Sequence, residues 1–372
     1  MRVCVITTVH PPDDVRINRE LRSLVKAGHD VFFIAPEGRF DIEGVEYIAV
    51  TKQQGRMKRF LRGSREAFAK AIGVEADIYH FHDPELLGLG KKLKRRGKKV
   101  IYDIHEDYPS VILMKNWIPR WIRPIISKTF AVYQSAAIRR FDAIVITVKE
   151  YLTSIGRYRE LAVVPNYPEL ELLEGLSDCT ADCDTVPVKF IYVGSLDDDR
   201  AIVETIEAFK VLRDRGVDLE LELVGPVYSA RIQESINETL EKYAGLSFST
   251  RMPYLEAMTR VARSHVGLLI VHRGKSKEES SPLKLFEYMA LGKPQIASNF
   301  KAWRDILDRG PSALYVDPED VTQIAEKMNE FCSNRALIRE MGSRAEKLSQ
   351  SFQWRASEKE MLALYERIRV KR

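Results

Sequence analysis

The sequence alternates short runs of β-branched and aliphatic residues with segments whose apolar residues recur at helical spacing. Ile17, Leu21 and Leu24, for example, share one helical face between the first two runs. The runs of the first half are Val3–Thr7, Val31–Ile34, Ile78–Phe81, Val100–Ile104, Ala143–Thr147 and Leu161–Val164. Those of the second half are Val188–Val193, Leu219–Val224, Leu246–Ser249, Val266–Ile270, Gln295–Ser298 and Ala313–Val316. This alternation predicts βα units around parallel sheets, and hence the α/β fold class with two doubly wound domains.

The length of 372 residues agrees with two domains, since one domain usually has roughly 100 to 200 residues. We expect an N-terminal domain over residues 1–168, a linker over 169–184 and a C-terminal domain over 185–354. The closing segment, 355–372, has a helical pattern and is expected to cross back onto the first domain. Doubly wound sheets bind ligands beyond the carboxyl ends of their strands, so the domains are expected to face a central cleft.

Several classes of protein are disfavoured by the pattern of apolar residues and cysteines. No stretch approaches the roughly 18 consecutive apolar residues of a membrane span, and the first apolar run ends at prolines and aspartates, unlike a signal peptide. Cys179 and Cys183 are the one close pair of cysteines, in a polar stretch with too few ligands for zinc. We interpret this stretch as a solvated linker, with a disulfide or metal as the less favoured alternative. The cysteine usage predicts a cytoplasmic protein.

The loops after the first strand of each half carry the first chemical information. Neither contains G-x-G-x-x-G, so a nicotinamide-dependent dehydrogenase is not expected. After Gly194 and Ser195 a helix begins, and its N-terminus together with Arg200 could hold a diphosphate. The aspartate run at residues 197–199 resembles a metal-binding DxD, but we favour a helix N-cap with solvated neighbours.

The most informative stretch runs from Glu279 to Ser298. Glu279 and Glu287 are eight positions apart, one before a predicted helix and one within it, and Lys284 shares a helical face with Glu287. A nucleotide-sugar requires such a set, with acceptors for ribose and sugar hydroxyls and a cation for phosphate. On spacing alone, a surface helix with an ion pair three residues apart is the simpler interpretation.

The stretch resembles the E-x7-E and "FEYMA-x-G-x-P" signature of the retaining family 4 glycosyltransferases, which have the GT-B fold of two Rossmann-like domains. The resemblance covers nearly the whole chain. It includes the loop after the first strand and four further motifs: His80–Asp83, Tyr102–Pro109, Val164–Pro168 and Tyr192–Leu196. Phe352, Gln353 and Trp354, at the start of the last helix, also match.

In that family the second domain binds the nucleotide-sugar and the first binds the acceptor. By resemblance, Glu287 would bind the ribose, Glu279 the sugar hydroxyls, and Lys284 and Arg200 the diphosphate. His105, at a strand end of the first domain, would reach the donor sugar. The expected donor-binding residues are Gly194, Ser195, Arg200, Leu283, Lys284 and Glu287. The catalytic candidates are His105, Glu279 and Asp107, and the residues expected to position the acceptor or sugar are His10, His82 and Asp83.

The chain departs from the common family pattern in three places. Asp13 and Asp14 replace a pair of glycines after the first strand, and Ser195 stands where an arginine is usual. Serines replace a glycine and a phenylalanine after Glu279, which leaves Glu278 as an alternative contact for the donor sugar.

The resemblance implies a retaining reaction in which stabilisation of the departing diphosphate supplies much of the catalysis. The acceptor hydroxyl would attack from the face of the leaving group and lose its proton to a phosphate oxygen. No metal and no other cofactor are expected, and the donor is a UDP-, GDP- or ADP-sugar. The residues do not distinguish these donors, and they leave the acceptor and the oligomeric state open.

Charge is distributed unevenly along the chain. Residues 1–168 carry 29 Lys and Arg against 19 Asp and Glu, whereas the remainder carries 29 against 34. Two basic segments also contain large apolar residues. They are residues 52–70, with Phe60 and Leu61, and residues 108–141, which contain Trp117 and Trp121 and no acidic residue. Basic amphipathic segments with tryptophan favour an anionic membrane surface over a simple solvated helix face. Without a nucleic-acid motif, binding to nucleic acid is not expected.

We therefore expect a cytoplasmic glycosyltransferase, peripheral on the inner face of the membrane, that acts on a lipid-linked or surface-polysaccharide acceptor. Two alternatives remain. One is a non-catalytic partner subunit of the same fold that binds nucleotide-sugar or glycan, and the other is a nucleotide-sugar epimerase.

Overall fold

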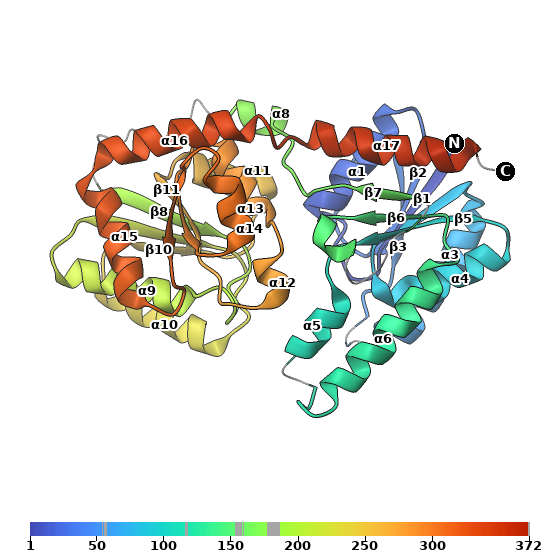
Figure 1. Ribbon diagram of the computed structural model, residues 1–372, viewed down its shortest axis with the longest axis horizontal. Helices are drawn as coiled ribbons and strands as arrows, with labels where there is room; N and C mark the ends of the chain where they lie inside the picture. The colour runs from blue at the N-terminus through green and yellow to red at the C-terminus, as the bar shows by residue number, and fades with distance from the viewer. Residues whose placement is uncertain are drawn as a thin grey trace. The chain divides into compact units, whose positions relative to one another are not determined.

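The computed structural model describes residues 1–53, 55, 58–115, 118–152, 158, 160–176 and 187–370. The predictions made for Arg56, Met57, Trp117, Cys179 and Cys183 lie outside these residues. The chain divides into two compact units, of which the first comprises residues 1–166 and 355–372 and the second residues 167–354. Each is a parallel α/β sheet covered by helices (Figure 1), which confirms the predicted fold class.

The first unit contains a seven-stranded sheet in the order β3-β2-β1-β4-β5-β6-β7. Its strands are β1 (Arg2–Ile6), β2 (Asp30–Pro36), β3 (Val45–Val50), β4 (Ile78–Phe81), β5 (Lys99–Ile104), β6 (Ala143–Ile146) and β7 (Leu161–Val163). The helices are α1 (Val15–Lys26), α3 (Ser64–Val74), α4 (Leu87–Arg95), α5 (Tyr108–Met114), α6 (Arg123–Ile138) and α17 (Trp354–Val370), with short turns η1 (Arg59–Gly63), η2 (Pro84–Leu86) and η3 (Lys149–Tyr151). The sequence analysis missed β3, an edge strand whose residues are mostly half-buried rather than uniformly apolar.

The second unit contains a six-stranded sheet in the order β10-β9-β8-β11-β12-β13. Its strands are β8 (Val188–Val193), β9 (Leu219–Val224), β10 (Leu246–Ser249), β11 (Val266–Leu269), β12 (Gln295–Ser298) and β13 (Ala313–Val316). The helices are α8 (Glu171–Glu174), α9 (Ile202–Asp214), α10 (Ala230–Lys242), α11 (Tyr254–Ala262), α12 (Lys275–Glu278), α13 (Leu283–Ala290), α14 (Lys301–Leu307), α15 (Val321–Ser333) and α16 (Arg335–Ser349). Leu173 of α8, in the segment expected to be a linker, is buried in this unit's core.

Both sheets have central strands that are buried on both faces, as in β1, where Val3 to Ile6 are fully buried. Such runs are typical of parallel sheets because helices cover both sides. In each sheet the strand order reverses once, between β1 and β4 in the first unit and between β8 and β11 in the second. The carboxyl ends of the strands at this reversal are where doubly wound sheets bind ligands.

Helix α17 returns to the first unit and packs beside α1 (Figure 1). Ser357 donates a hydrogen bond to the carbonyl of Pro165 at 2.9 Å, and the Tyr365 hydroxyl lies 2.8 Å from Nδ1 of His80. Tyr365 and Ile368 are buried. The last helix is therefore part of the first unit's core.

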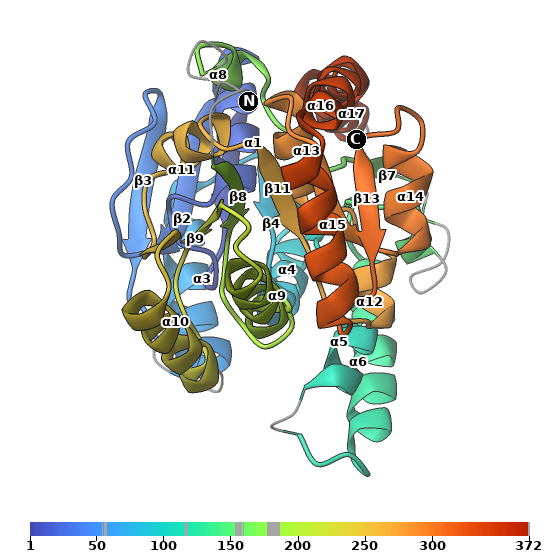
Figure 2. The same ribbon diagram turned by 90° about the vertical axis from the view of Figure 1, so that its left-hand side faces the viewer.

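Helices α5 and α6 project away from the sheet of the first unit (Figures 1 and 2). They pack against each other, and Ser127 of α6 donates a hydrogen bond to the carbonyl of Pro109 at 2.7 Å. None of the described helices is both long and apolar enough to span a bilayer.

Candidate functional site

The loop between β1 and α1 in the first unit is held by Asp83, which follows β4. One oxygen of Asp83, Oδ2, accepts hydrogen bonds from the hydroxyl groups of Thr7 and Thr8 and from the backbone N–H groups of Thr8 and Val9. Asp83 is 1% exposed. The N–H donors of this loop, which could otherwise bind an anionic ligand, are therefore satisfied by a carboxylate of the chain itself.

The N-terminus of α1 is likewise capped by a carboxylate, that of Asp14. Its carboxylate accepts from the N–H groups of Arg16 and Ile17 at 3.0 and 3.1 Å, and Nδ1 of His10 lies 3.1 Å from its other oxygen. Burial lowers the pKa of His10, but the hydrogen bond and charge of Asp14, with Asp83, outweigh it and raise this pKa to about 9. The hydrogen bond from His10 in turn lowers the pKa of Asp14 against the effect of burial.

His82 and His105 follow the ends of β4 and β5 and meet through their rings. Nδ1 of His82 lies 2.9 Å from Nε2 of His105. His82 is fully buried, whereas 14% of the His105 side chain is exposed. Burial lowers the pKa of His82 well below its usual value and that of His105 to about 3, so both rings are neutral at neutral pH. Of the two, His105 is the one that a ligand could touch directly.

Beneath these histidines lies a buried polar cluster that the sequence analysis did not identify. Arg16 contacts Asp103 at 2.8 Å and Glu20 at 3.1 Å, and all three side chains are 5% exposed or less. Arg16 and Glu20 are four residues apart on a helical face, which was the available sequence signal. A buried charge on α1 is stable because its partner is buried with it.

The cluster also contains side chains of the kinds that bind metal ions, namely carboxylates and imidazoles. Glu20, His80, His82 and Asp103 each offer an atom, and these four atoms lie within 4.8 Å of one another. The guanidinium of Arg16, however, already lies against both carboxylates, and a metal cation there would face this like charge. The arrangement therefore fits a hydrogen-bonded network better than a cation site.

Asp107, a catalytic candidate, lies directly before α5. Its carboxylate accepts a hydrogen bond from the hydroxyl of Ser110 at 2.5 Å, within the first turn of that helix. This contact gives Asp107 a local role at the start of α5.

In the second unit, Lys284 of α13 lies over the residues that end β8. Its ammonium is 3.1 Å from the Tyr192 hydroxyl and 4.4 Å from the centre of that ring. Gly194 has a φ of +143°, and a Cβ there would collide with the ammonium. Glycine is therefore favoured at this position by the backbone conformation, and any larger residue would also displace the Lys284 ammonium.

The charge of Lys284 is set by its surroundings. Burial and the neighbouring charge of Arg200 lower its pKa to about 7, against the opposing effect of Glu287 and Asp197. Glu287 lies one turn further along α13 and is 3% exposed. Burial is the largest cause of this low pKa, and a buried lysine with a perturbed pKa beside an arginine is a candidate for a site that binds an anionic ligand.

The loop from Ser195 to Arg200 is organised by Asp197. Ser195 donates a hydrogen bond to Asp197 at 2.8 Å, and Arg200 lies 3.6 Å from the other carboxylate oxygen. Asp199 forms an ion pair with Lys277 at 2.8 Å. The expectation that the aspartate run is a helix N-cap was wrong, because α9 begins after Ala201, which makes no side-chain cap.

Helix α9, which follows Arg200, and helix α13, which contains Lys284, both begin without a side-chain cap. The residue before α9 is Ala201, with a φ of +46°, and the residue before α13 is Pro282. Leu283 is the first residue of α13. Uncapped N–H groups and the positive end of the helix dipole favour an anion.

Glu278 and Glu279 differ in their contacts. Glu278 accepts from the N–H of Gly274 at 3.2 Å and lies 3.9 Å from Arg273. For the half-buried Glu279, no hydrogen bond or ion pair is recorded among the described residues. Glu279 is therefore the better placed of the two to bind a ligand.

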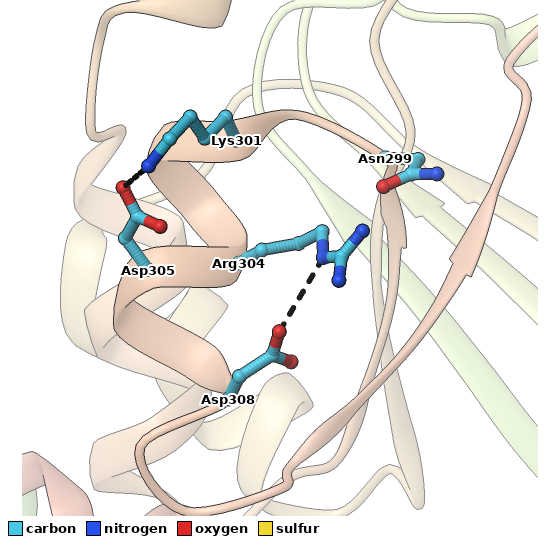
Figure 3. Close-up of a pocket in the computed structure, with 5 residues that line it drawn as sticks. All are labelled: Asn299, Lys301, Arg304, Asp305 and Asp308. Carbon is cyan, nitrogen blue, oxygen red and sulfur yellow. Dashed lines mark hydrogen bonds and ion pairs between the residues drawn. The ribbon is translucent and has the colours of Figure 1, made fainter.

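A polar pocket of about 390 Å³ lies along α14 (Figure 3). Two of its cations are paired with carboxylates four residues away, Lys301 with Asp305 at 2.6 Å and Arg304 with Asp308 at 3.4 Å. Both cations that line this pocket therefore already have a carboxylate partner on the same helix.

Comparison with known proteins identifies the class of this fold and site. The model described as "Glycosyl transferases group 1" matches residues 184–348, and that described as "Glycosyltransferase Family 4" matches residues 15–170. The chain belongs to the family 4 glycosyltransferases of the GT-B fold. A search of curated protein sequences gives no match.

Solved structures agree in fold over the whole chain. The sucrose-phosphate synthase of Thermosynechococcus elongatus matches with a TM-score of 0.78 at 16% identity, covering 99% of this chain and 98% of that one. A glycosyltransferase from Rickettsia africae matches at 0.73 and 15%, covering 100% and 99%. A UDP-forming trehalose-phosphate synthase from Burkholderia xenovorans matches at 0.71 and 15%, covering 99% and 98%. At these identities the likeness establishes the fold alone.

Proposed function

We propose that this glycosyltransferase uses a nucleotide-sugar as donor and transfers the sugar, with retention, to a hydroxyl of a lipid-linked or surface-polysaccharide acceptor. The observation that carries the donor assignment is the pair of Lys284 and Arg200 beside two uncapped helix N-termini. The departing diphosphate, which accumulates negative charge as the glycosidic bond breaks, is the group that such an arrangement stabilises. The family resemblance supports retention.

In this mechanism the second unit supplies the electrostatics and the first supplies a neutral polar contact. Lys284 and Arg200 bind the diphosphate, Glu287 binds the ribose, and Glu279 binds hydroxyls of the donor sugar. His105, with its low pKa and partial exposure, contacts the reacting sugar as a neutral imidazole. The buried Asp83 and His82 act by holding the loop and the ring of His105 rather than by touching the acceptor. This mechanism requires no metal ion.

The donor assignment is tested by binding and turnover. A panel of UDP-, GDP- and ADP-sugars should contain one that raises the melting temperature by mass action, and the same donor should be hydrolysed slowly without acceptor. Glu287→Ala should abolish both effects. Tight binding without turnover under any acceptor would instead indicate a non-catalytic binding protein, and an isomerised sugar would indicate an epimerase.

The exposed surface of α5 and α6 supports a lipid-linked acceptor at a membrane. Trp121 is 76% exposed, Ile125 60% and Val132 64%, and no acidic residue occurs between Tyr108 and Phe141. Arg120 and Lys128 are exposed beside them. Apolar side chains surrounded by cations bind anionic bilayers by burial and by charge attraction together. We place the protein at the inner face of the membrane on this basis.

A second surface of the first unit has the same character. Phe60 and Leu61 of η1 are exposed and line a groove of about 550 Å³ with Arg65 and Lys92. Part of its lining belongs to the first of the two basic segments, and Glu85, Gly88 and Lys92 complete it. It supports contact with an anionic lipid surface at η1 as well as at α6.

Sedimentation with vesicles tests the membrane assignment. The protein should bind phosphatidylglycerol-containing vesicles, and added salt should release it because surface charges are screened. Replacing Trp121, Ile125 and Val132 by serine should weaken binding. The control replaces Tyr228, Leu240 and Leu255, exposed large apolar residues of the second unit, and should leave binding unchanged. Equal loss in both variants would refute the role of α6, and transfer to a soluble sugar phosphate alone would refute the lipid-linked acceptor.

A further inference from the structure

Three side chains of the first unit, Glu20, His82 and His105, lie in a row that leads from the core to the partly exposed His105. Nε2 of His105 lies 2.9 Å from Nδ1 of His82, and Nε2 of His82 lies 3.5 Å from Oε2 of Glu20. Glu20 and His82 are both fully buried. Within the described residues, neither Nε2 of His82 nor Oε2 of Glu20 has another hydrogen-bond partner. A small shift would bring these two atoms to an ordinary hydrogen-bond distance.

The two rings carry one proton each, because burial keeps both imidazoles neutral. A neutral imidazole donates from one nitrogen and accepts at the other. The proton position on His82 therefore fixes the proton position on His105. All polar contacts recorded for the His105 ring in the described residues are made by Nε2, to His82 and to Asp103, so Nδ1 is the nitrogen available to a ligand.

We propose that Glu20, His82 and His105 form a proton relay, in which the proton that His105 gives or takes at Nδ1 is stored on Glu20. The proposal rests on the proposed contact between His105 and the reacting sugar. It assigns Glu20 a role in the reaction although this side chain touches no substrate.

The relay has two states that differ by one proton. In the first, protonated Glu20 donates to Nε2 of His82, His82 donates from Nδ1 to Nε2 of His105, and His105 carries its proton on Nδ1. When a ligand oxygen takes that proton, the proton of His82 passes from Nδ1 to His105 Nε2, and the proton of Glu20 passes to His82 Nε2. Glu20 is then a carboxylate and His105 presents a lone pair. The reverse sequence removes a proton from a hydroxyl.

The surroundings of Glu20 suit it to store a proton. Burial and the charges of Asp103 and Asp14 raise its pKa well above the usual range, while Arg16 and Arg19 on its own helix lower it. His82 faces it from β4, and Tyr365 lies nearby on α17. Arg16 lies 2.8 Å from Asp103 and 3.1 Å from Glu20, and the pKa of Asp103 is lowered while that of Glu20 is raised, so the two carboxyl groups differ in charge. A base with a raised pKa exchanges protons more effectively near neutral pH than an ordinary glutamate.

Nitrogen NMR of the full-length protein tests the relay without substrate. With all seven histidines labelled with ¹⁵N, the His105 signals are identified by their loss in His105→Asn. In the wild type, Nδ1 of His105 should change from protonated to unprotonated over one pH range, and His82 should change with it. In Glu20→Gln, which keeps the shape of the side chain but cannot exchange a proton, both rings should stay in one form. A transition that persists in Glu20→Gln, or no transition in the wild type, overturns the proposal.

The matched control is Tyr365→Phe, which removes a hydroxyl from the same buried cluster; this hydroxyl lies 2.8 Å from Nδ1 of His80, which is not a member of the relay. It should keep the transition of His105. In turnover assays, Glu20→Gln should lower kcat at least tenfold and flatten its pH profile, with the KM for the donor unchanged. Absence of transfer by a wild type that still shows the NMR transition would refute the proposed function and leave the relay intact.

Discussion

The two units share one plan of parallel sheet and helices, yet the loops that follow their first strands, β1 and β8, differ in how their polar groups are satisfied. In the first unit, Asp14 caps α1 and Asp83 occupies the N–H groups of the preceding loop. In the second, α9 and α13 begin without side-chain caps, and Lys284 and Arg200 lie close to each other. The loop after β1 uses carboxylates of the chain itself to satisfy its N–H groups, whereas the N–H groups at the start of α9 and α13 have no side-chain cap.

The comparison also shows that net charge is a poor guide to an anion site. Residues 1–168 have an excess of cations and the remainder has an excess of anions. The donor site that we propose nevertheless belongs to the acidic half, because a diphosphate is bound by a few N–H groups and cations directed at one place. The excess positive charge of the first unit instead includes exposed cations on α6 and η1.

The largest effect is expected from Lys284→Met, which keeps the length of the side chain and removes its charge. Loss of the cation at the diphosphate should lower kcat/KM for the nucleotide-sugar about 10²- to 10³-fold. Lys210→Met, at a lysine of α9 paired with Glu207, is the control and should have little effect. An equal loss in both variants would contradict the assignment of the site to α13.

A smaller effect is expected from His105→Asn, which tests the first unit. We expect kcat to fall about 100-fold, as for removal of a positioned polar group at the reacting sugar. The affinity for the free nucleoside diphosphate, measured by calorimetry, should remain unchanged because the second unit binds it. Weakened nucleotide binding would contradict the proposal that the second unit binds the nucleotide and the first unit contacts only the sugar.

The pairing of His10 should make the stability of the protein dependent on pH. Its pKa in the folded protein, about 9, exceeds its usual 6.5, so the stabilisation is complete below about pH 6.5 and is lost as the pH rises through 9. The free energy of unfolding should fall by on the order of 2 kcal/mol over this range. Denaturant unfolding at several pH values measures it. His10→Gln should remove this part of the pH dependence, and an unchanged profile would contradict the contact with Asp14.

The smallest single contribution is expected from the cap at the N-terminus of α1, which Asp14→Ala removes. Loss of the cap should cost about 1 kcal/mol of unfolding free energy. Asp320→Ala is matched to it, because Asp320 caps α15 in the second unit and accepts from the N–H of Gln323. Asp14→Ala should cost more than its control, since it also removes the partner of His10. Equal costs would show that the His10 contact adds nothing to stability.

The alternation of apolar runs predicted most of the sheets, because central parallel strands are continuous apolar segments. It missed β3, which lies at an edge and is half-buried. The motif from Glu279 to Ser298 predicted the position of Lys284 and Glu287 on one helix. The sequence did not predict that Tyr192 lies beneath Lys284, since 92 residues separate them.

The sequence by itself determined the fold class, the division of the chain into two domains and the membership in the family, because these depend on local periodicity and short motifs. Only the tertiary structure decided which polar groups satisfy one another. Glu20, His82, Asp103 and Tyr365 come from one β-sheet and two helices, and their separation along the chain conceals their contact. Burial then shifts their pKa values, an effect that depends on the neighbours in space and not on the neighbours in sequence.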